Sequence, residues 1–235
     1  MHIGILVANT DHSDFAKARP GDGEKFRALL QPLRPSWTFT AVQVEAGEFP
    51  DTVNSFDGYI ITGSPASANG TEAWVEKLMG FIRELNATKI PTIGICFGHQ
   101  VIARALGGRV DKNPGGWGFG VALTNFEAHE KWMVPAFPNL NLYSAHNEQV
   151  VALPPNAEVL GGSAFCPIGS YKIGNHIFTT EYHPEMTPEF IIDLSHAFEK
   201  YVGTDIAERA RAQFATPADG KIFAQWMVQF FESPR

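Results

Sequence analysis

Short apolar runs alternate with helix-like patterns along the first half of the chain. The apolar runs have the length of strands and span residues 2–8, 39–44, 58–62 and 92–96. Between and after them, apolar residues recur at helical spacing near residues 23–33, 72–86 and 98–106. Strands that alternate with helices connect by right-handed crossovers, so the pattern predicts a parallel sheet covered by helices.

The second half of the chain has a different pattern. Short β-like runs, separated by Gly, Pro and Asn, span residues 141–143, 149–152, 158–160 and 177–181. They predict added or antiparallel strands. Helical patterns return at residues 189–201, 206–213 and 218–231. In the last of these helices, aromatic and apolar residues recur at helical spacing and are expected to belong to the core rather than to a binding surface.

Composition bounds the class of protein. The 235 residues carry no repeat and no linker, so we expect a single domain over residues 1–235. There are 18 Lys and Arg against 25 Asp and Glu, a net charge of −7 with no basic stripe, so nucleic acid is not expected as a partner. No apolar run reaches the roughly 18 residues of a membrane span, and residues 3–8 lack a basic flank. A membrane partner is therefore not expected, and the chain is predicted to be cytoplasmic.

The cysteines, Cys96 and Cys166, are too few for a disulfide framework or a four-cysteine zinc cage. His99 could be combined with Cys96 and His183 as metal ligands, but no ligand pair has the short repeated spacing of a structural zinc site. We therefore expect no metal and no cofactor. Cys166, between Phe165 and Pro167, is expected to be a small core residue.

Residues 92–100 (Thr-Ile-Gly-Ile-Cys-Phe-Gly-His-Gln) run from an apolar strand through Gly-x-Cys-x-Gly into a helix. This is the thiol version of a nucleophile elbow. Gly94 and Gly98 are required there, because a sharp strand-to-helix turn brings backbones too close for side chains. The turn would place Cys96 at a helix amino terminus, where backbone amides favour the thiolate. The alternative is an inert cysteine buried between a core strand and its helix.

A thiolate that forms an acyl intermediate also needs a proton shuttle, normally histidine held by a carboxylate or amide. His183 lies in Glu-Tyr-His-Pro-Glu, residues 181–185, directly after an apolar run. Pro184 keeps this segment out of a helix, so His183 and Glu185 point the same way and can lie close together. Alone, such a tripeptide is also typical of a turn before a helix.

Together, residues 94–100 and 182–185 closely resemble the class I glutamine amidotransferase family. Residues 60–65 (Ile-Ile-Thr-Gly-Ser-Pro) are similar to the family's oxyanion strand, and residues 143–147 (Tyr-Ser-Ala-His-Asn) to its glutamine-binding stretch. The matches spread over residues 58–186. The resemblance implies an α/β, flavodoxin-like fold, in which helices flank an open, mostly parallel sheet with an added antiparallel β segment.

The resemblance implies cysteine-dependent hydrolysis of a γ-glutamyl amide through a thioester. Cys96 would be the nucleophile, His183 the base and then the acid, and Glu185 the orienting carboxylate. The other implied site residues are the backbone amides of Gly63, Ser64 and Phe97 for the oxyanion hole, and Gln100, His146 and Asn147 for substrate binding.

Two positions depart from the family pattern. Glu181 stands where the family usually has Gln, and Ala-His-Asn at residues 145–147 replaces the more usual Ser-His-Gly. The contacts to the α-amino and α-carboxylate groups of the substrate therefore do not carry over directly.

The implied partner is a small molecule, glutamine or another γ-glutamyl compound. Only about fifty residues follow Glu185, too few for a synthase domain. Ammonia would pass to a separate synthase, or the enzyme would act alone as a γ-glutamyl peptide hydrolase. Residues 114–120 (Pro-Gly-Gly-Trp-Gly-Phe-Gly) look like the Gly-Trp-x-x-Gly of stand-alone members and favour the second interpretation. A catalytically silent binding module of the same fold and a non-glutaminyl cysteine amidase stay open.

Two loops, residues 9–22 and 64–70, follow the first and third predicted strands. Loops at the carboxyl ends of parallel strands border the ligand crevice of an open sheet. These loops are candidate lids or selectivity walls, with ordinary solvated loops as the alternative.

Overall fold

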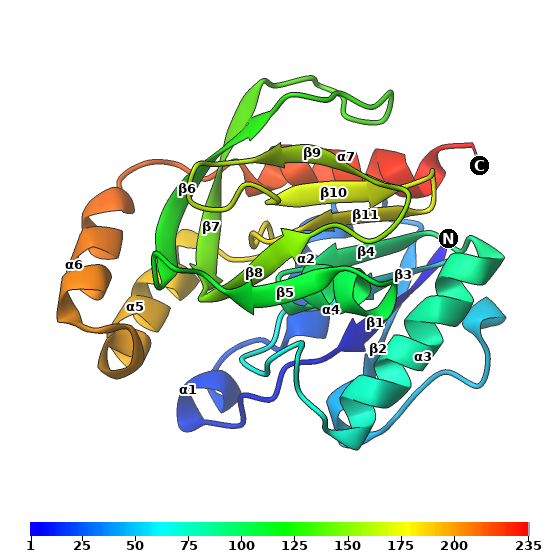
Figure 1. Ribbon diagram of the computed structural model, residues 1–235, viewed down its shortest axis with the longest axis horizontal. Coiled ribbons are helices and arrows are strands. Elements are labelled where there is room, and N and C mark those ends of the chain that lie inside the picture. Colours follow the sequence, from blue (N-terminus) through cyan, green and yellow to red (C-terminus); the bar gives the residue numbers. More distant parts are fainter. Residues whose placement is uncertain (235) are drawn as a thin grey trace.

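The computed structural model describes residues 1–234. Across these residues a nine-stranded sheet has the order β2-β1-β3-β4-β11-β10-β9-β6-β7 (Figure 1). Its parallel part contains β2 (Thr38–Gln43), β1 (His2–Val7), β3 (Gly58–Ile61), β4 (Thr92–Ile95) and β11 (Ile177–Thr180). Its antiparallel part continues through β10 (Ser170–Ile173), β9 (Ala157–Gly162), β6 (Gly118–Phe126) and β7 (Asn139–His146). A separate antiparallel ladder joins β5 (Arg109–Lys112) to β8 (Glu148–Ala152).

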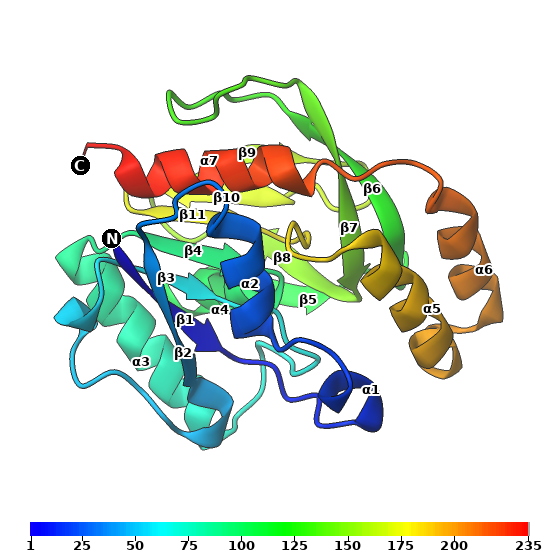
Figure 2. The same ribbon diagram turned by 180° about the vertical axis from the view of Figure 1, so that it is seen from behind.

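Helices cover both faces of the parallel strands. On one face, α3 (Ala73–Thr88) and α4 (Phe97–Ala105) pack over residues of β1, β3 and β10 (Figure 1). On the other, α2 (Asp22–Leu30) and α7 (Gly220–Glu232) pack over β1, β3 and β4 (Figure 2). The central strands β1, β3, β4 and β11 are buried because they lie between two helical layers, whereas the edge strand β2 is partly exposed. The predicted fold class, an open, mostly parallel sheet with an added antiparallel segment, is confirmed.

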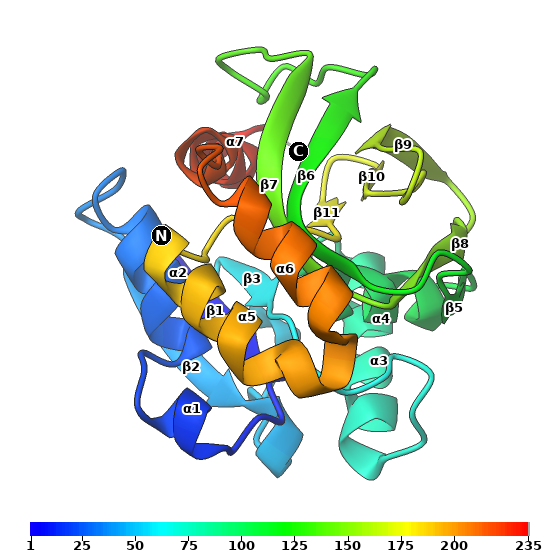
Figure 3. The same cartoon turned by 90° about the vertical axis from the view of Figure 1, so that its left-hand side faces the viewer.

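A third group of helices closes one end of the molecule. Helices α5 (Pro188–Val202) and α6 (Thr204–Gln213) pack against each other and against β6 and β7 (Figure 3). Their apolar side chains form a small cluster with Tyr143 of β7 and Phe15 of the short helix α1 (Asp14–Lys17). Two short 3-10 turns, Val44–Ala46 and Val53–Ser55, follow β2 and precede β3.

The sequence pattern did not predict β5, β6, β10 or α1. β6 alternates small, polar and apolar residues and contains Gly120 at a φ of 121°, so it lacks the run of branched residues that marks a strand. β5 and β10 are four-residue strands with lysine in each. These strands form because their neighbours, β7, β8 and β9, supply the pairing partners.

The carboxyl ends of β1, β3, β4 and β11 meet at one edge of the sheet because these neighbours run parallel. Gly63 follows β3, Cys96 follows β4, and His183 follows β11. Ligands bind at this edge in open α/β sheets. Within residues 1–234, no helix combines the length and the apolar character that crossing a membrane requires.

Candidate active site

Cys96 occupies the turn between β4 and α4, with a φ of 49° and a ψ of −105°. A positive φ is a strained backbone conformation for a residue with a side chain. A Cβ atom at Gly98 would lie 2.2 Å from the carbonyl oxygen of Ile61, and one at Gly94 would lie 2.7 Å from that of Gly98. The prediction that close backbone approaches require both glycines is confirmed. The bend is a strand-to-helix elbow with Cys96 at its tip.

Replacing Gly98 by alanine is expected to lower the free energy of unfolding by about 1–3 kcal/mol, because the added methyl group overlaps the backbone of β3. Gly80 of α3 is the matched control, since nothing lies within 4 Å of a Cβ added there. Gly80→Ala should stabilise the helix by about 0.5–1 kcal/mol. Urea unfolding of both variants measures the difference. A wild-type midpoint for Gly98→Ala would contradict the packing account of the elbow.

His183 and Glu185 form a buried pair. The Nδ1 atom of His183 lies 2.7 Å from Oε1 of Glu185, and the side chains are only 7% and 4% exposed. The backbone N–H of His183 donates to the carbonyl of Tyr143 in an isolated antiparallel bridge, which fixes the segment against β7. An acceptor at Nδ1 sets the tautomer and leaves Nε2 as the exchangeable nitrogen. The expected proximity of the imidazole and the carboxylate is confirmed.

Gly63 lies between the cysteine and the histidine. A Cβ atom built on Gly63 would be 2.9 Å from Cε1 of His183 and 3.7 Å from Cβ of Cys96. All three residues, together with Glu185, line one cavity. The structure therefore brings together the residues that the sequence placed in the triad, although 87 positions separate Cys96 from His183 in the chain.

The surroundings of the Cys96 thiol favour its protonated form. Burial raises the pKa of the thiol well above its usual range, and a negative charge on Glu181 or Glu185 raises it further. The backbone N–H of Phe97 acts in the opposite direction by hydrogen-bonding the sulfur. The amide at the helix amino terminus therefore acts on the pKa in the expected direction, but the loss of water has a larger effect of the opposite sign.

The three predicted substrate-binding residues line the same cavity. The amide nitrogen of Gln100 is already used, since Nε2 donates to the carbonyl of Glu148 and to Oε1 of Glu181, both at 2.8 Å. Asn147 contributes its backbone carbonyl to Asn113 of the loop after β5.

One ring nitrogen of His146 has no hydrogen-bond partner. Its Nδ1 lies 3.0 Å from Oγ of Ser144, and that hydroxyl donates to the carbonyl of Gly118, so Nδ1 is the donor of the pair. Burial, and then His183, lower the pKa of His146 to about 3, so the ring is neutral. Nε2 of His146 is therefore a buried acceptor without a hydrogen-bond partner.

Glu148, at the start of β8, also lines the cavity and was not predicted from the sequence. Its carboxylate accepts a hydrogen bond from the hydroxyl of Ser67 at 2.7 Å. The available signal was its position, two residues after His146 in the stretch that resembles the glutamine-binding segment. Glu148 provides the cavity with a carboxylate that can receive a substrate ammonium group.

The cavity has a volume of about 620 Å³, within the usual range of small-molecule sites. The loop after β1 and the start of the loop after β3 form part of its wall, as predicted for residues 9–22 and 64–70. An apolar part of its lining, here called the outer wall, is formed by Phe15, Met186, Phe190, Leu194 and Phe198, with Arg19 over the ring of Phe15 and Lys25 over that of Phe190. Among residues 1–234, no group of three His, Cys, Asp or Glu side chains is arranged to hold a metal ion.

Solved structures share the fold. The crystal structure of a glutamine amidotransferase from Thermotoga maritima has a TM-score of 0.77 at 16% identity and covers 98% of each chain. The crystal structure of a glutamine amidotransferase from Methylobacillus flagellatus has a TM-score of 0.71 at 20% identity and covers 97% of this chain and 94% of that one. Both are evidence for the architecture alone.

Sequence comparison identifies the family. Gamma-glutamyl peptidase 3 of Arabidopsis thaliana is 30% identical over 241 residues, which cover 97% of this chain and 95% of that protein. One of the subunits of the glutamine-hydrolyzing GMP synthase of Saccharolobus solfataricus is 32% identical over 139 residues, which cover 58% of this chain and 71% of that one. The family model for glutamine amidotransferase class I matches residues 33–190. The chain therefore belongs to the class I glutamine amidotransferase family.

Proposed function

We propose that the protein hydrolyses a γ-glutamyl amide bond through a thioester on Cys96. The sulfur attacks the γ-carbonyl carbon while Nε2 of His183 takes the thiol proton. His183 then gives this proton to the leaving nitrogen, and the amine departs. Water, activated by the same imidazole, attacks the thioester and releases glutamate. The observation that carries the proposal is the 2.7 Å contact between His183 and Glu185 beside a cysteine held at a strained elbow.

Glu185 orients the imidazole and stabilises its charged form. Its Oε1 accepts the hydrogen at Nδ1, and its buried Oε2 has no other partner. The attacked carbonyl gains negative charge in the tetrahedral intermediate, and backbone amides of Gly63 or Ser64 and of Phe97 would receive it. Support for this role is the position of Gly63 against Cys96 and the hydrogen bond from the Phe97 amide to the sulfur.

We assign the amino-acid end of the substrate to the cavity wall around β8. A γ-glutamyl group carries an α-ammonium, and the Glu148 carboxylate is an acceptor there, while the ring of His146 lines the same wall with its Nε2 buried. Asn147 lies between them in the chain. Gln100 supports this wall by its hydrogen bond to the backbone of Glu148, so its part is to hold the site rather than to offer its amide nitrogen to substrate.

The outer part of the cavity favours a γ-glutamyl peptide or amide larger than glutamine. Its apolar side chains lie beyond the triad, where the leaving group would extend. Ammonia, the leaving group of glutamine, leaves such a wall unused. The whole-length similarity to a protein named gamma-glutamyl peptidase supports the same choice. The second candidate, supply of ammonia to a separate synthase, is supported by the shorter match to the GMP synthase chain.

A substrate panel separates these functions. Glutamate release should be measured with glutamine, a γ-glutamyl dipeptide and γ-glutamyl anilide, each with wild type and with Cys96→Ser as the blank. We expect higher kcat/KM for the substrates with large leaving groups. Preference for glutamine would favour the synthase-linked function, and no Cys96-dependent release on any substrate would favour a silent binding module.

Phe190 tests the leaving-group wall. It lies on α5 with its ring centroid 5.8 Å from that of Phe15, and both rings line the cavity. Phe190→Ala is expected to raise KM for γ-glutamyl anilide about tenfold, equivalent to about 1.4 kcal/mol, with less than about a twofold change for glutamine. Ile192→Ala, at an exposed position of the same helix, is the control. Equal effects of Phe190→Ala on both substrates would contradict this assignment.

A further inference from the structure

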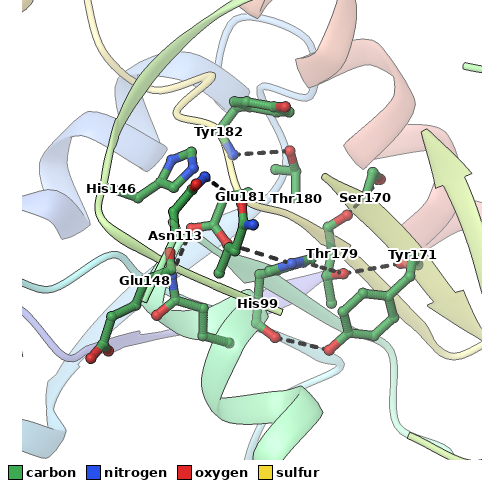
Figure 4. Close-up of polar contacts among 12 residues, drawn as sticks. His99, Asn113, His146, Glu148, Ser170, Tyr171, Thr179, Thr180, Glu181 and Tyr182 are labelled. Atoms are coloured by element: carbon green, nitrogen blue, oxygen red, sulfur yellow. Dashed lines mark hydrogen bonds and ion pairs between the residues drawn. The ribbon is translucent and has the colours of Figure 1, made fainter. Parts of the chain in front are cut away.

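A buried polar cluster lies beside the nucleophile, around Glu181 (Figure 4). The Glu181 side chain is fully buried, and its carboxyl interacts with the Cys96 thiol. Its Oε1 accepts a hydrogen bond from Nε2 of Gln100 at 2.8 Å. Its Oε2 has no hydrogen-bond partner. An ionised carboxylate without water and with one free oxygen would be costly at this position.

His99 faces the free oxygen of Glu181. Its Nδ1 lies 2.8 Å from Oγ1 of Thr179, and the Thr179 hydroxyl donates to the carbonyl of Tyr171 at 3.1 Å. Because the single hydroxyl proton is used there, Nδ1 of His99 must be the donor to Thr179. Burial, and then His146, lower the pKa of His99 to about 3 against the opposite effect of a hydrogen bond with the backbone of Ile168, so the ring is neutral and its Nε2 carries a lone pair without a proton.

The two atoms without partners point to a shared proton. Nε2 of His99 lies 3.6 Å from Oε2 of Glu181, and neither atom has another hydrogen-bond partner. With Glu181 ionised, two lone pairs would face each other in a dry interior. With a proton on Oε2, the carboxyl becomes a donor and Nε2 its acceptor. Burial raises the pKa of Glu181 well above its usual range, and the Glu148 carboxylate raises it further.

The hydrogen bonds to Glu181 oppose this rise only in part. The contacts with Gln100 and Cys96 lower the pKa of Glu181, but burial has the largest effect. The titratable groups that act on the carboxyl or respond to it come from several elements: Cys96 at the elbow, His99 on α4, Glu148 on β8, Tyr171 on β10, Cys166 in the preceding loop, and the adjacent Tyr182. Of these groups only His99 can carry a positive charge, and its ring is neutral.

We infer that Glu181 is held as a neutral carboxylic acid, with its proton on Oε2 facing Nε2 of His99, and that it acts as a positioning residue for Cys96. In this state Glu181 places no negative charge beside the sulfur. When the pH rises far enough to remove its proton, the carboxylate opposes formation of the thiolate. The importance of Glu181 for turnover depends on the proposed thioester function, but the protonation state of Glu181 does not.

Infrared spectroscopy tests the proton directly. A neutral carboxyl has a C=O stretching band that a carboxylate lacks. Wild type at neutral pH should have this band, and Glu181→Gln, which keeps the shape and can accept the same hydrogen bond from Gln100, should lose it. Glu189→Gln, which removes an exposed carboxyl, should keep the band. Absence of a Glu181-dependent band at neutral pH would overturn the inference. A titration of wild type alone, in which the band disappears only at alkaline pH, supports it without a variant.

Alkylation of Cys96 tests the consequence. Rates with iodoacetamide, assigned to Cys96 by mass spectrometry, should agree within about twofold for wild type and Glu181→Gln at and below neutral pH, because both side chains are uncharged. At alkaline pH the variant should react faster, since it cannot become negative. If Glu181 were already ionised, removing its charge would lower the pKa of Cys96 by about one unit or more. The variant would then react about tenfold faster at neutral pH, and this result would overturn the inference.

Neither measurement uses a substrate, so their outcome is independent of the proposed hydrolysis. A Glu181-dependent carboxyl band in a protein without turnover would leave this inference standing and remove the proposed function. Turnover that depends on Cys96, in a protein without the band, would support the proposed function and remove this inference.

Discussion

Cys96→Ser is expected to lower kcat for glutamate release by about 10⁴–10⁶ while the fold is retained. The serine hydroxyl is a far weaker nucleophile than a thiolate, and it has the same size, so the backbone at a φ of 49° meets no new contact. Single-turnover assays with the preferred γ-glutamyl substrate measure the loss, and circular dichroism checks the fold.

Cys166→Ser is the matched control for this experiment. Cys166 is fully buried on the loop between β9 and β10 and has no elbow around it, as predicted for a core residue. Its variant should retain turnover within about twofold. Activity near the wild-type value in Cys96→Ser would show that the reaction proceeds through another group.

Glu185→Gln is expected to reduce kcat by about 10²–10⁴, with a smaller change in KM. The amide keeps the size of the side chain but removes the charge that stabilises the imidazolium. Its nitrogen can also donate to Nδ1 of His183 and thereby favour the wrong tautomer, since the present 2.7 Å contact requires an acceptor. Steady-state kinetics over a range of pH measure both parameters.

Glu189→Gln removes another carboxyl four residues further along the chain, one that is exposed on α5. It should leave kcat within about twofold of wild type. Equal losses in Glu185→Gln and Glu189→Gln would indicate a general effect of charge, and no loss in Glu185→Gln would remove the carboxylate from the mechanism.

The parallel half of the sheet could be predicted because its strands are buried on both faces. Residues 58–62 and 92–96 consist almost entirely of apolar or small residues, and the structure has β3 and β4 there. β6 could not be found in this way, because it pairs with β7 along its length and is half exposed. Its strand conformation depends on long-range pairing rather than on its own residues.

The residues proposed for the triad could be found in the sequence because each part of the arrangement has a local cause. Gly94 and Gly98 are needed by the elbow itself, and Pro184 keeps His183 and Glu185 on one side of an extended segment. The roles of Glu148 and of the apolar outer wall could not be predicted. They depend on β8 and α5 reaching the same edge of the sheet, which no local pattern records.

The charge state of the nucleophile was also beyond the sequence. The elbow suggested a stabilised thiolate, but burial raises the pKa of Cys96, and so does any negative charge on Glu181 or Glu185, which come from a segment 85 or more positions away. Such shifts depend on three-dimensional burial, and residue order gives no measure of it.

The most direct test of the central claim is covalent labelling with a diazoketone analogue of glutamine, followed by mass spectrometry of the digested protein. We predict one adduct per chain, located on Cys96, whose formation is slowed by an excess of γ-glutamyl substrate and abolished in His183→Ala. An unlabelled Cys96, or a label on Cys166 or elsewhere that substrate does not protect, would contradict the account.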